Sequence, residues 1–73
     1  MLAYYNISAW VSLVIERIVY GIEDKVIFYV QNNETNEKIG RKRRATVRYT
    51  AKGHAYFMHN RTRVYLDDCM RVS

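Results

Sequence analysis

The chain has 73 residues, of which 49% are hydrophobic and 26% are charged, and its formal net charge is +5. This length suits one domain whose core only just offsets the loss of chain entropy, and the composition is too apolar for a disordered chain. Cys69 is the single cysteine, which excludes an intrachain disulfide and fits a reducing compartment. We therefore predict one domain over residues 1–73 that folds without cross-links.

The first twenty residues are apolar but lack the features of a targeting or membrane-spanning segment. No basic region leads them, and Glu16 and Arg17 interrupt the apolar run. Residues 1–9 could form a short strand or cover one end of a barrel. Residues 10–20 fit both a helical and an alternating pattern, but five of these eleven residues are β-branched, which favours a strand. We predict no membrane association and a cytoplasmic location, in the host cytoplasm if a phage encodes the protein.

The middle of the chain contains the clearest strand. A tight turn over residues 21–24 leads into residues 25–31, which are rich in Val, Ile, Phe and Tyr. Both faces of this segment are apolar, which indicates a central strand covered on two sides. After a polar turn, residues 43–50 alternate as a half-buried strand does. The side chains expected to face the core are Ala45, Val47 and Tyr49, and those expected to share the opposite, solvent-facing surface are Arg44, Thr46, Arg48 and Thr50.

The last third of the chain is predicted to form a hairpin and a helical turn. Residues 54–58 and 63–66 would pair around a turn at residues 59–62. The inward side chains would be those of Ala55, Phe57, Val64 and Leu66. The outward ones would be those of His54, Tyr56, Arg63 and Tyr65. Residues 67–71 are predicted to form one helical turn, capped by Asp67 or Asp68.

These elements together predict a mainly β fold of about five short antiparallel strands. A flat sheet of this size has two exposed edges, and closing it into a partly open barrel removes most of them. We therefore expect a small antiparallel barrel or a strongly twisted sheet, SH3-like or OB-like. The N-terminal segment would pack across one end, and a short helical turn would lie near the C-terminus.

The charge is unevenly distributed, which points to a polyanionic partner. Residues 1–37 carry a net charge of −3 and residues 38–73 carry +8. Basic side chains neutralise phosphates and aromatic rings stack on bases, and the basic half interleaves both. We predict a non-enzymatic nucleic-acid-binding domain, with DNA and RNA both open. The candidate binding residues are Arg41, Lys42, Arg43, Arg44, Arg48, Lys52, Tyr56, Arg61, Arg63 and Tyr65.

Three other interpretations compete with nucleic-acid binding. Outward Arg and Tyr side chains also serve as cross-strand partners and as solubilising groups. The chain resembles, in its size and its all-β single-domain character, the small accessory proteins of phages and mobile elements, among them anti-CRISPR and anti-defence proteins. That resemblance implies a protein-interaction module or inhibitor that docks on an acidic protein or a nucleoprotein. A third alternative is a homodimer formed through the apolar N-terminal segment.

The residues capable of catalysis or metal binding do not form a recognisable set. His54, His59 and Cys69 have a spacing that fits no closed zinc site, which needs four ligands. Asp67 and Asp68 have no third carboxylate nearby in the sequence with which to hold Mg²⁺. We predict no enzymatic activity, no cofactor and no metal.

Overall fold

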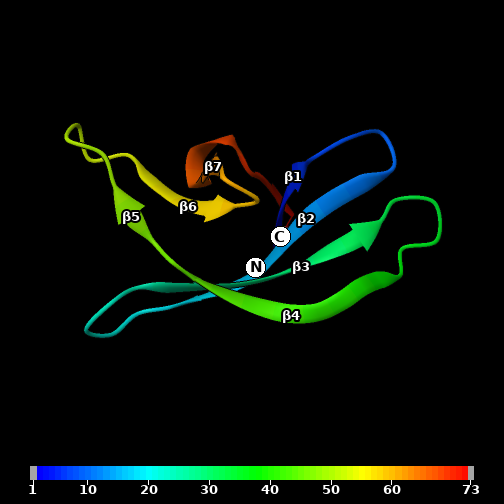
Figure 1. The fold of residues 1–73 in the computed structure, drawn as a ribbon, viewed down its shortest axis with the longest axis horizontal. Coiled ribbons are helices and arrows are strands. Elements are labelled where there is room, and N and C mark those ends of the chain that lie inside the picture. The colour runs from blue at the N-terminus through cyan, green and yellow to red at the C-terminus, as the bar shows by residue number, and fades with distance from the viewer. Residues whose placement is uncertain (1, 73) are drawn as a thin grey trace.

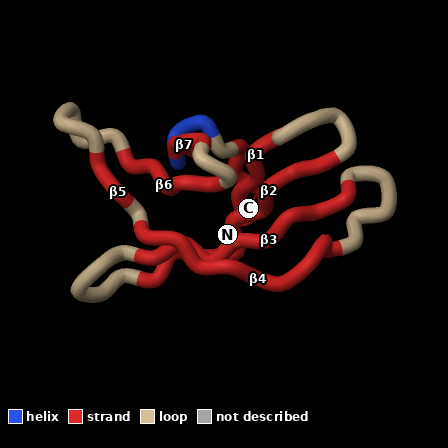
Figure 2. The backbone as a smooth tube through the Cα atoms, viewed as in Figure 1, coloured by secondary structure: helices blue, strands red, loops and turns tan. Residues whose placement is uncertain are grey.

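The computed structural model describes residues 2–72 and is mainly β (Figures 1 and 2). Within these residues lie eight strands and one 3-10 turn, η1. Their bounds are β1 (Leu2–Asn6), β2 (Val11–Val19), β3 (Lys25–Asn32), β4 (Lys38–Thr46), β5 (Arg48–Tyr49), β6 (Ala55–His59), β7 (Thr62–Tyr65), η1 (Leu66–Asp68) and β8 (Met70–Val72). No helix in the described part of the chain is long and apolar enough to cross a membrane.

The strands form two antiparallel sheets. The larger has the order β4-β3-β2-β1-β8, and the smaller has the order β5-β6-β7. Figure 1 shows how β4 bends along one side of the molecule and continues into β5, so that one length of chain passes from the larger sheet to the smaller. The predicted mainly β, antiparallel fold is confirmed, but the two sheets do not close into a barrel.

The core lies between the two sheets. Leu13, Val26 and Phe57 are completely buried, and Phe28 is only 3% exposed. The rings of Phe28, from the larger sheet, and Phe57, from the smaller, lie 5.2 Å apart between centroids. Burying such side chains supplies most of the free energy that holds the sheets together.

Several strands confirm the sequence prediction. Residues 10–20 yield β2, and residues 25–31 yield β3, which lies inside the larger sheet between β4 and β2. Val26, Ile27 and Phe28 are all buried, as expected for a strand that is apolar on both faces. A second layer nevertheless covers only one face, because the two sheets and η1 account for every element of residues 2–72. We call the other face of the larger sheet the outer face.

The second hairpin is also confirmed. Phe57 and Val64 face the core, and Tyr56 lies opposite Tyr65. The turn between β6 and β7 has two residues, Asn60 and Arg61, with φ angles of 48° and 63°. Positive φ at both central positions is what a tight hairpin with the native strand twist requires.

Other predictions fail because they rest on local sequence patterns, whereas pairing between strands that are distant in the sequence determines the fold. Residues 2–72 contain eight strands rather than about five, and of the two alternatives for the N-terminal segment the short strand is observed: β1 lies inside the larger sheet and does not cover an end of the fold. The helical turn is limited to residues 66–68, and Tyr65 precedes it without a capping bond, so neither Asp67 nor Asp68 is a cap. Residues 70–72 instead form β8, which pairs with β1.

The strand predicted for residues 43–50 differs from the observed structure in where it begins and in being divided between two strands, β4 and β5. It begins earlier, since β4 starts at Lys38. It is interrupted at Val47, whose N–H donates to the carbonyl of Asp24 instead of continuing the ladder. Tyr49 was expected to face the core but is 58% exposed, because its hydroxyl donates a 2.9 Å hydrogen bond to the Asp24 carboxylate. That bond raises the pKa of Tyr49.

Candidate functional site

The smaller sheet brings four of the predicted binding residues onto one surface. Arg48, Tyr56 and Tyr65 lie directly opposite one another across β5, β6 and β7. Arg63 is two residues before Tyr65 on β7, and its partner on β6 is Met58. Since residues two apart on a strand share a face, these side chains form one surface. We call it the tyrosine–arginine face: Arg48, Tyr56, Met58, Arg63 and Tyr65.

Contacts within this face hold Arg63 in place. Its guanidinium carbon lies 4.6 Å from the centroid of the Tyr56 ring, which is cation–π distance. Its Nη1 donates to the Tyr65 hydroxyl at 3.3 Å, and this bond raises the pKa of Arg63 further above its ordinary value. The rings of Tyr56 and Tyr65 lie 5.5 Å apart and are tilted by 47°. Arg63 is therefore a charged, oriented group between two rings.

Two further predicted residues lie in the turns at either end of β6. Lys52 is in the turn that joins β5 to β6, and Arg61 is in the turn that joins β6 to β7. Both side chains are exposed. They extend the positive charge beyond the tyrosine–arginine face in both directions along β6.

The basic run at residues 41–44 lies elsewhere, on β4 of the larger sheet. Lys42 forms an ion pair with Glu16, with 2.8 Å between Nζ and Oε1, and this bond lowers the pKa of the Glu16 carboxyl. Arg43 faces the other way, towards His59. Burial of His59, together with the charge of Arg43, lowers the pKa of that imidazole.

Arg44 and Arg48 do not share a surface, contrary to the prediction. Arg44 lies opposite Ile27 on β3, whereas Arg48 lies opposite Tyr56 on β6. Between them Val47 is buried in the core, and at this point the chain passes from one sheet to the other. Alternation along a single strand suggested one wet face, but that face is divided between two sheets.

The residues considered for metal binding or catalysis are spread apart. His54 Nδ1 lies 3.9 Å from Asp67 Oδ2, and both side chains are largely exposed. Burial raises the pKa of the Cys69 thiol to about 11, and Sγ donates to the carbonyl of Tyr65 at 3.5 Å. No cluster of three or more His, Cys, Asp or Glu side chains suited to a metal occurs in residues 2–72.

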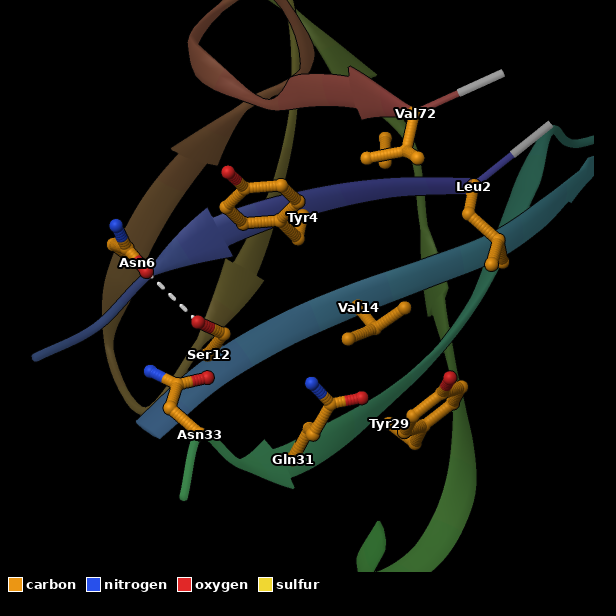
Figure 3. Close-up of a pocket in the computed structure, with 10 residues that line it drawn as sticks. Leu2, Tyr4, Asn6, Ser12, Val14, Tyr29, Gln31, Asn33 and Val72 are labelled. Atoms are coloured by element: carbon orange, nitrogen blue, oxygen red, sulfur yellow. Dashed lines mark hydrogen bonds between the residues drawn. The ribbon is translucent and has the colours of Figure 1, made fainter. Parts of the chain in front are cut away.

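The outer face carries a groove that the sequence analysis missed (Figure 3). This cavity of about 400 Å³ is lined by side chains from β1, β2, β3 and β8 and by Asn33, just beyond β3. Tyr4 and Tyr29 stand on either side of Val14, because these three residues lie opposite one another across β1, β2 and β3. The sequence shows these residues at alternate positions along separate strands. Their meeting depends on strand order and register, which no local pattern supplies.

Comparisons with known proteins add no assignment. The chain shows no significant match to family models, to characterised proteins or to solved structures. The chemistry of the surfaces themselves is therefore the basis for any functional conclusion.

Proposed function

We propose that this protein binds nucleic acid, without catalysis, through the tyrosine–arginine face. The observation that carries the proposal is the position of Arg63, which stacks on Tyr56 and bonds to Tyr65. A cation fixed beside two rings offers a phosphate partner and two stacking surfaces within one small area. Single strands are commonly held by this combination of backbone charge and aromatic stacking.

The surrounding charge supports the same proposal. Lys52 and Arg61 lie beyond the two ends of β6, and Arg48 lies in the row that contains both tyrosines. A strand of nucleic acid running along β6 would meet cations before, on and after the aromatic rings. The +8 charge of residues 38–73 would also speed its approach.

The test is a fluorescence-anisotropy titration of the protein against a labelled single strand and a labelled duplex. Each titration is run at low and at near-physiological salt, since phosphate contacts make affinity fall with salt. Tyr56→Leu should weaken single-strand binding by about 1–3 kcal/mol, because it keeps an apolar side chain but removes a stacking surface. Arg63→Gln should weaken binding and lower the salt slope by about one contact.

Arg71→Gln is the matched control, because it removes the same charge from β8 of the other sheet. We expect Arg71→Gln to bind with little change in affinity. If Arg63→Gln and Arg71→Gln weaken binding equally, the effect is one of net charge and the tyrosine–arginine face is not the site. If no binding survives at near-physiological salt, the proposal fails altogether.

A second candidate function follows from the position of the basic run. Arg41, Lys42 and Arg43 lie on an edge strand, separate from the tyrosine–arginine face. An acidic protein or nucleoprotein could dock there, as an interaction module or inhibitor would require. Basic residues on an edge also discourage pairing with other chains. Arg41→Glu should abolish binding to such a partner and leave the oligonucleotide titrations above nearly unchanged.

A further inference from the structure

The outer face of the larger sheet holds three parallel rows of side chains with different chemistry. In the first row Asn6, Ser12 and Gln31 lie opposite one another. The second row is Tyr4, Val14 and Tyr29. The third contains Arg17, Ile27 and Arg44. Successive rows are two residues apart along β3, at Gln31, Tyr29 and Ile27, and therefore lie on the same face.

The aromatic row forms the walls and floor of the groove. Tyr4 and Tyr29 are separated by two strand spacings, about 9–10 Å, and Val14 lies between them, 5% exposed. The Tyr4 hydroxyl donates to the Met70 sulfur at 2.6 Å, which holds its ring at one side. Figure 3 shows Val14 on β2 between Tyr4 and Tyr29 on the neighbouring strands. A planar ring fits this surface by stacking on tyrosine and covering the valine.

The polar row supplies hydrogen-bonding groups at one side of the groove. Ser12 is 3% exposed, and its hydroxyl donates to Asn6 Oδ1 at 2.8 Å, which leaves the amide NH₂ of Asn6 as a donor. Gln31 Nε2 makes a long 3.5 Å contact with Asn36 Oδ1. Its Oε1 has no partner in residues 2–72 and remains an acceptor. A donor and an acceptor at the edge of a stacking surface suit the polar edge of a base.

The basic row supplies charge at the opposite side. Arg17 and Arg44 flank Ile27 and line the same two hollows of the surface. Neither makes an ion pair with a carboxylate in the described chain. Glu16, the acid nearest to them in the hollow, is occupied by Lys42. These hollows adjoin the tyrosine row and are not part of the groove itself, and two free guanidinium groups in the next row are suited to a phosphate.

From these three rows we infer that the groove binds a nucleotide, either free or as one unit of a single strand. The base would stack at Tyr29 and Tyr4, its edge would meet Asn6 and Gln31, and the phosphate would meet Arg17 and Arg44. The outer rows are four residues apart along β3, about 13 Å, which is within reach of a nucleotide from base edge to phosphate. This site lies on the opposite side of the protein from the tyrosine–arginine face and does not depend on it.

The experiment is an NMR titration of amide chemical shifts with AMP, CMP, GMP and UMP, and with inorganic pyrophosphate as a probe that has charge but no base. We expect at least one nucleotide to shift residues of β1, β2 and β3 together. Tyr29→Leu should weaken that nucleotide about tenfold by removing the stacking ring, while Tyr29→Phe should bind like the natural protein. Pyrophosphate should bind more weakly than the nucleotide and should be insensitive to Tyr29→Leu.

Charge variants separate the site from general attraction. Arg17→Gln and Arg44→Gln should each weaken the nucleotide about tenfold, whereas Arg71→Gln, which removes the same charge from β8, should have little effect. The amide spectrum of each variant shows directly whether it is folded. A longer single strand distinguishes the sources. If the strand binds more tightly than the mononucleotide and Tyr29→Leu removes this gain, the natural ligand is a single strand. If the strand binds no more tightly, the natural ligand is a free nucleotide.

Four results would overturn the inference. Pyrophosphate binding as tightly as every nucleotide would leave a phosphate site without a base site. Tyr29→Leu could bind as the natural protein does, which would remove the stacking surface. A lack of amide shifts at millimolar nucleotide would show that the groove does not bind nucleotides. Broadening of the amide signals of the same residues with protein concentration alone would assign the outer face to self-association instead.

Discussion

The turn between β6 and β7 stores backbone strain at Arg61, and glycine should release it. Arg61 has a φ of 63° and its neighbour Asn60 a φ of 48°. Asparagine tolerates this left-handed region, but a residue with a long side chain pays about 1–2 kcal/mol there. Glycine avoids that cost but loses about 0.5–1 kcal/mol through its greater freedom in the unfolded chain. We therefore predict that Arg61→Gly raises the free energy of unfolding by about 0.5–1 kcal/mol.

Thermal denaturation followed by circular dichroism measures this effect. For a domain of this size the change corresponds to a rise in Tm of roughly 2–8 °C. Arg61→Ala is the control, because it removes the charge and keeps the Cβ atom at positive φ. Its stability should stay within about 0.5 kcal/mol of the natural protein.

Two outcomes would refute the reasoning about Arg61. If alanine stabilises as much as glycine, the gain comes from removing charge in the basic half rather than from the backbone. If glycine does not stabilise, the left-handed conformation carries no net cost in this turn. Both variants also remove the positive charge of Arg61. If that charge contacts phosphate as proposed, Arg61→Gly and Arg61→Ala should weaken oligonucleotide binding by equal amounts.

Three further predictions concern the core and the titratable groups. Phe57→Ala should cost about 3–5 kcal/mol, a large part of the roughly 4–11 kcal/mol expected for a chain of this length, and a urea titration should show extensive loss of structure, whereas Phe57→Leu should remain folded. The thiol of Cys69 should react slowly with a disulfide reagent at pH 8 and rapidly in denaturant. Its pKa rises from 9.0 to about 11 on folding, so the native state holds the proton more tightly. The free energy of unfolding should therefore fall as pH rises across that range. Rapid native-state labelling would contradict this burial. Arg43→Gln should raise the pKa of His59 in an NMR titration, because it removes a neighbouring positive charge while burial remains. Since the native state favours neutral His59, stability should fall as pH drops below the ordinary histidine pKa, and less so in Arg43→Gln; an unchanged His59 pKa would mean that burial alone sets it.

The prediction of the second hairpin succeeded because its signals are local. Phe57 and Val64 alternate with polar residues on two short runs, and a tight turn joins them. Neighbouring strands joined by a two-residue turn have little choice of register. Tyr56, Arg63 and Tyr65 therefore met on one surface as expected.

The prediction failed where pairing joins distant segments. Residues 70 and 71 were predicted as the end of a helical turn, but residues 70–72 form β8 and pair with β1 at the other end of the chain. No local pattern marks three residues as a strand when their partner is more than sixty positions away. The same pairing placed β1 inside the sheet and ruled out the predicted cover over a barrel end.

The sequence by itself determined the composition of this protein's surfaces: a mainly β chain, a basic half, and aromatic residues at alternate positions of its strands. Only the tertiary structure decided which of these residues meet. Strand alternation fixes which side chains share a face within one strand, whereas strand order and register fix which faces lie side by side. That is why Arg44 and Arg48 separated onto two sheets, while Tyr4 and Tyr29, from different strands, came to flank one groove.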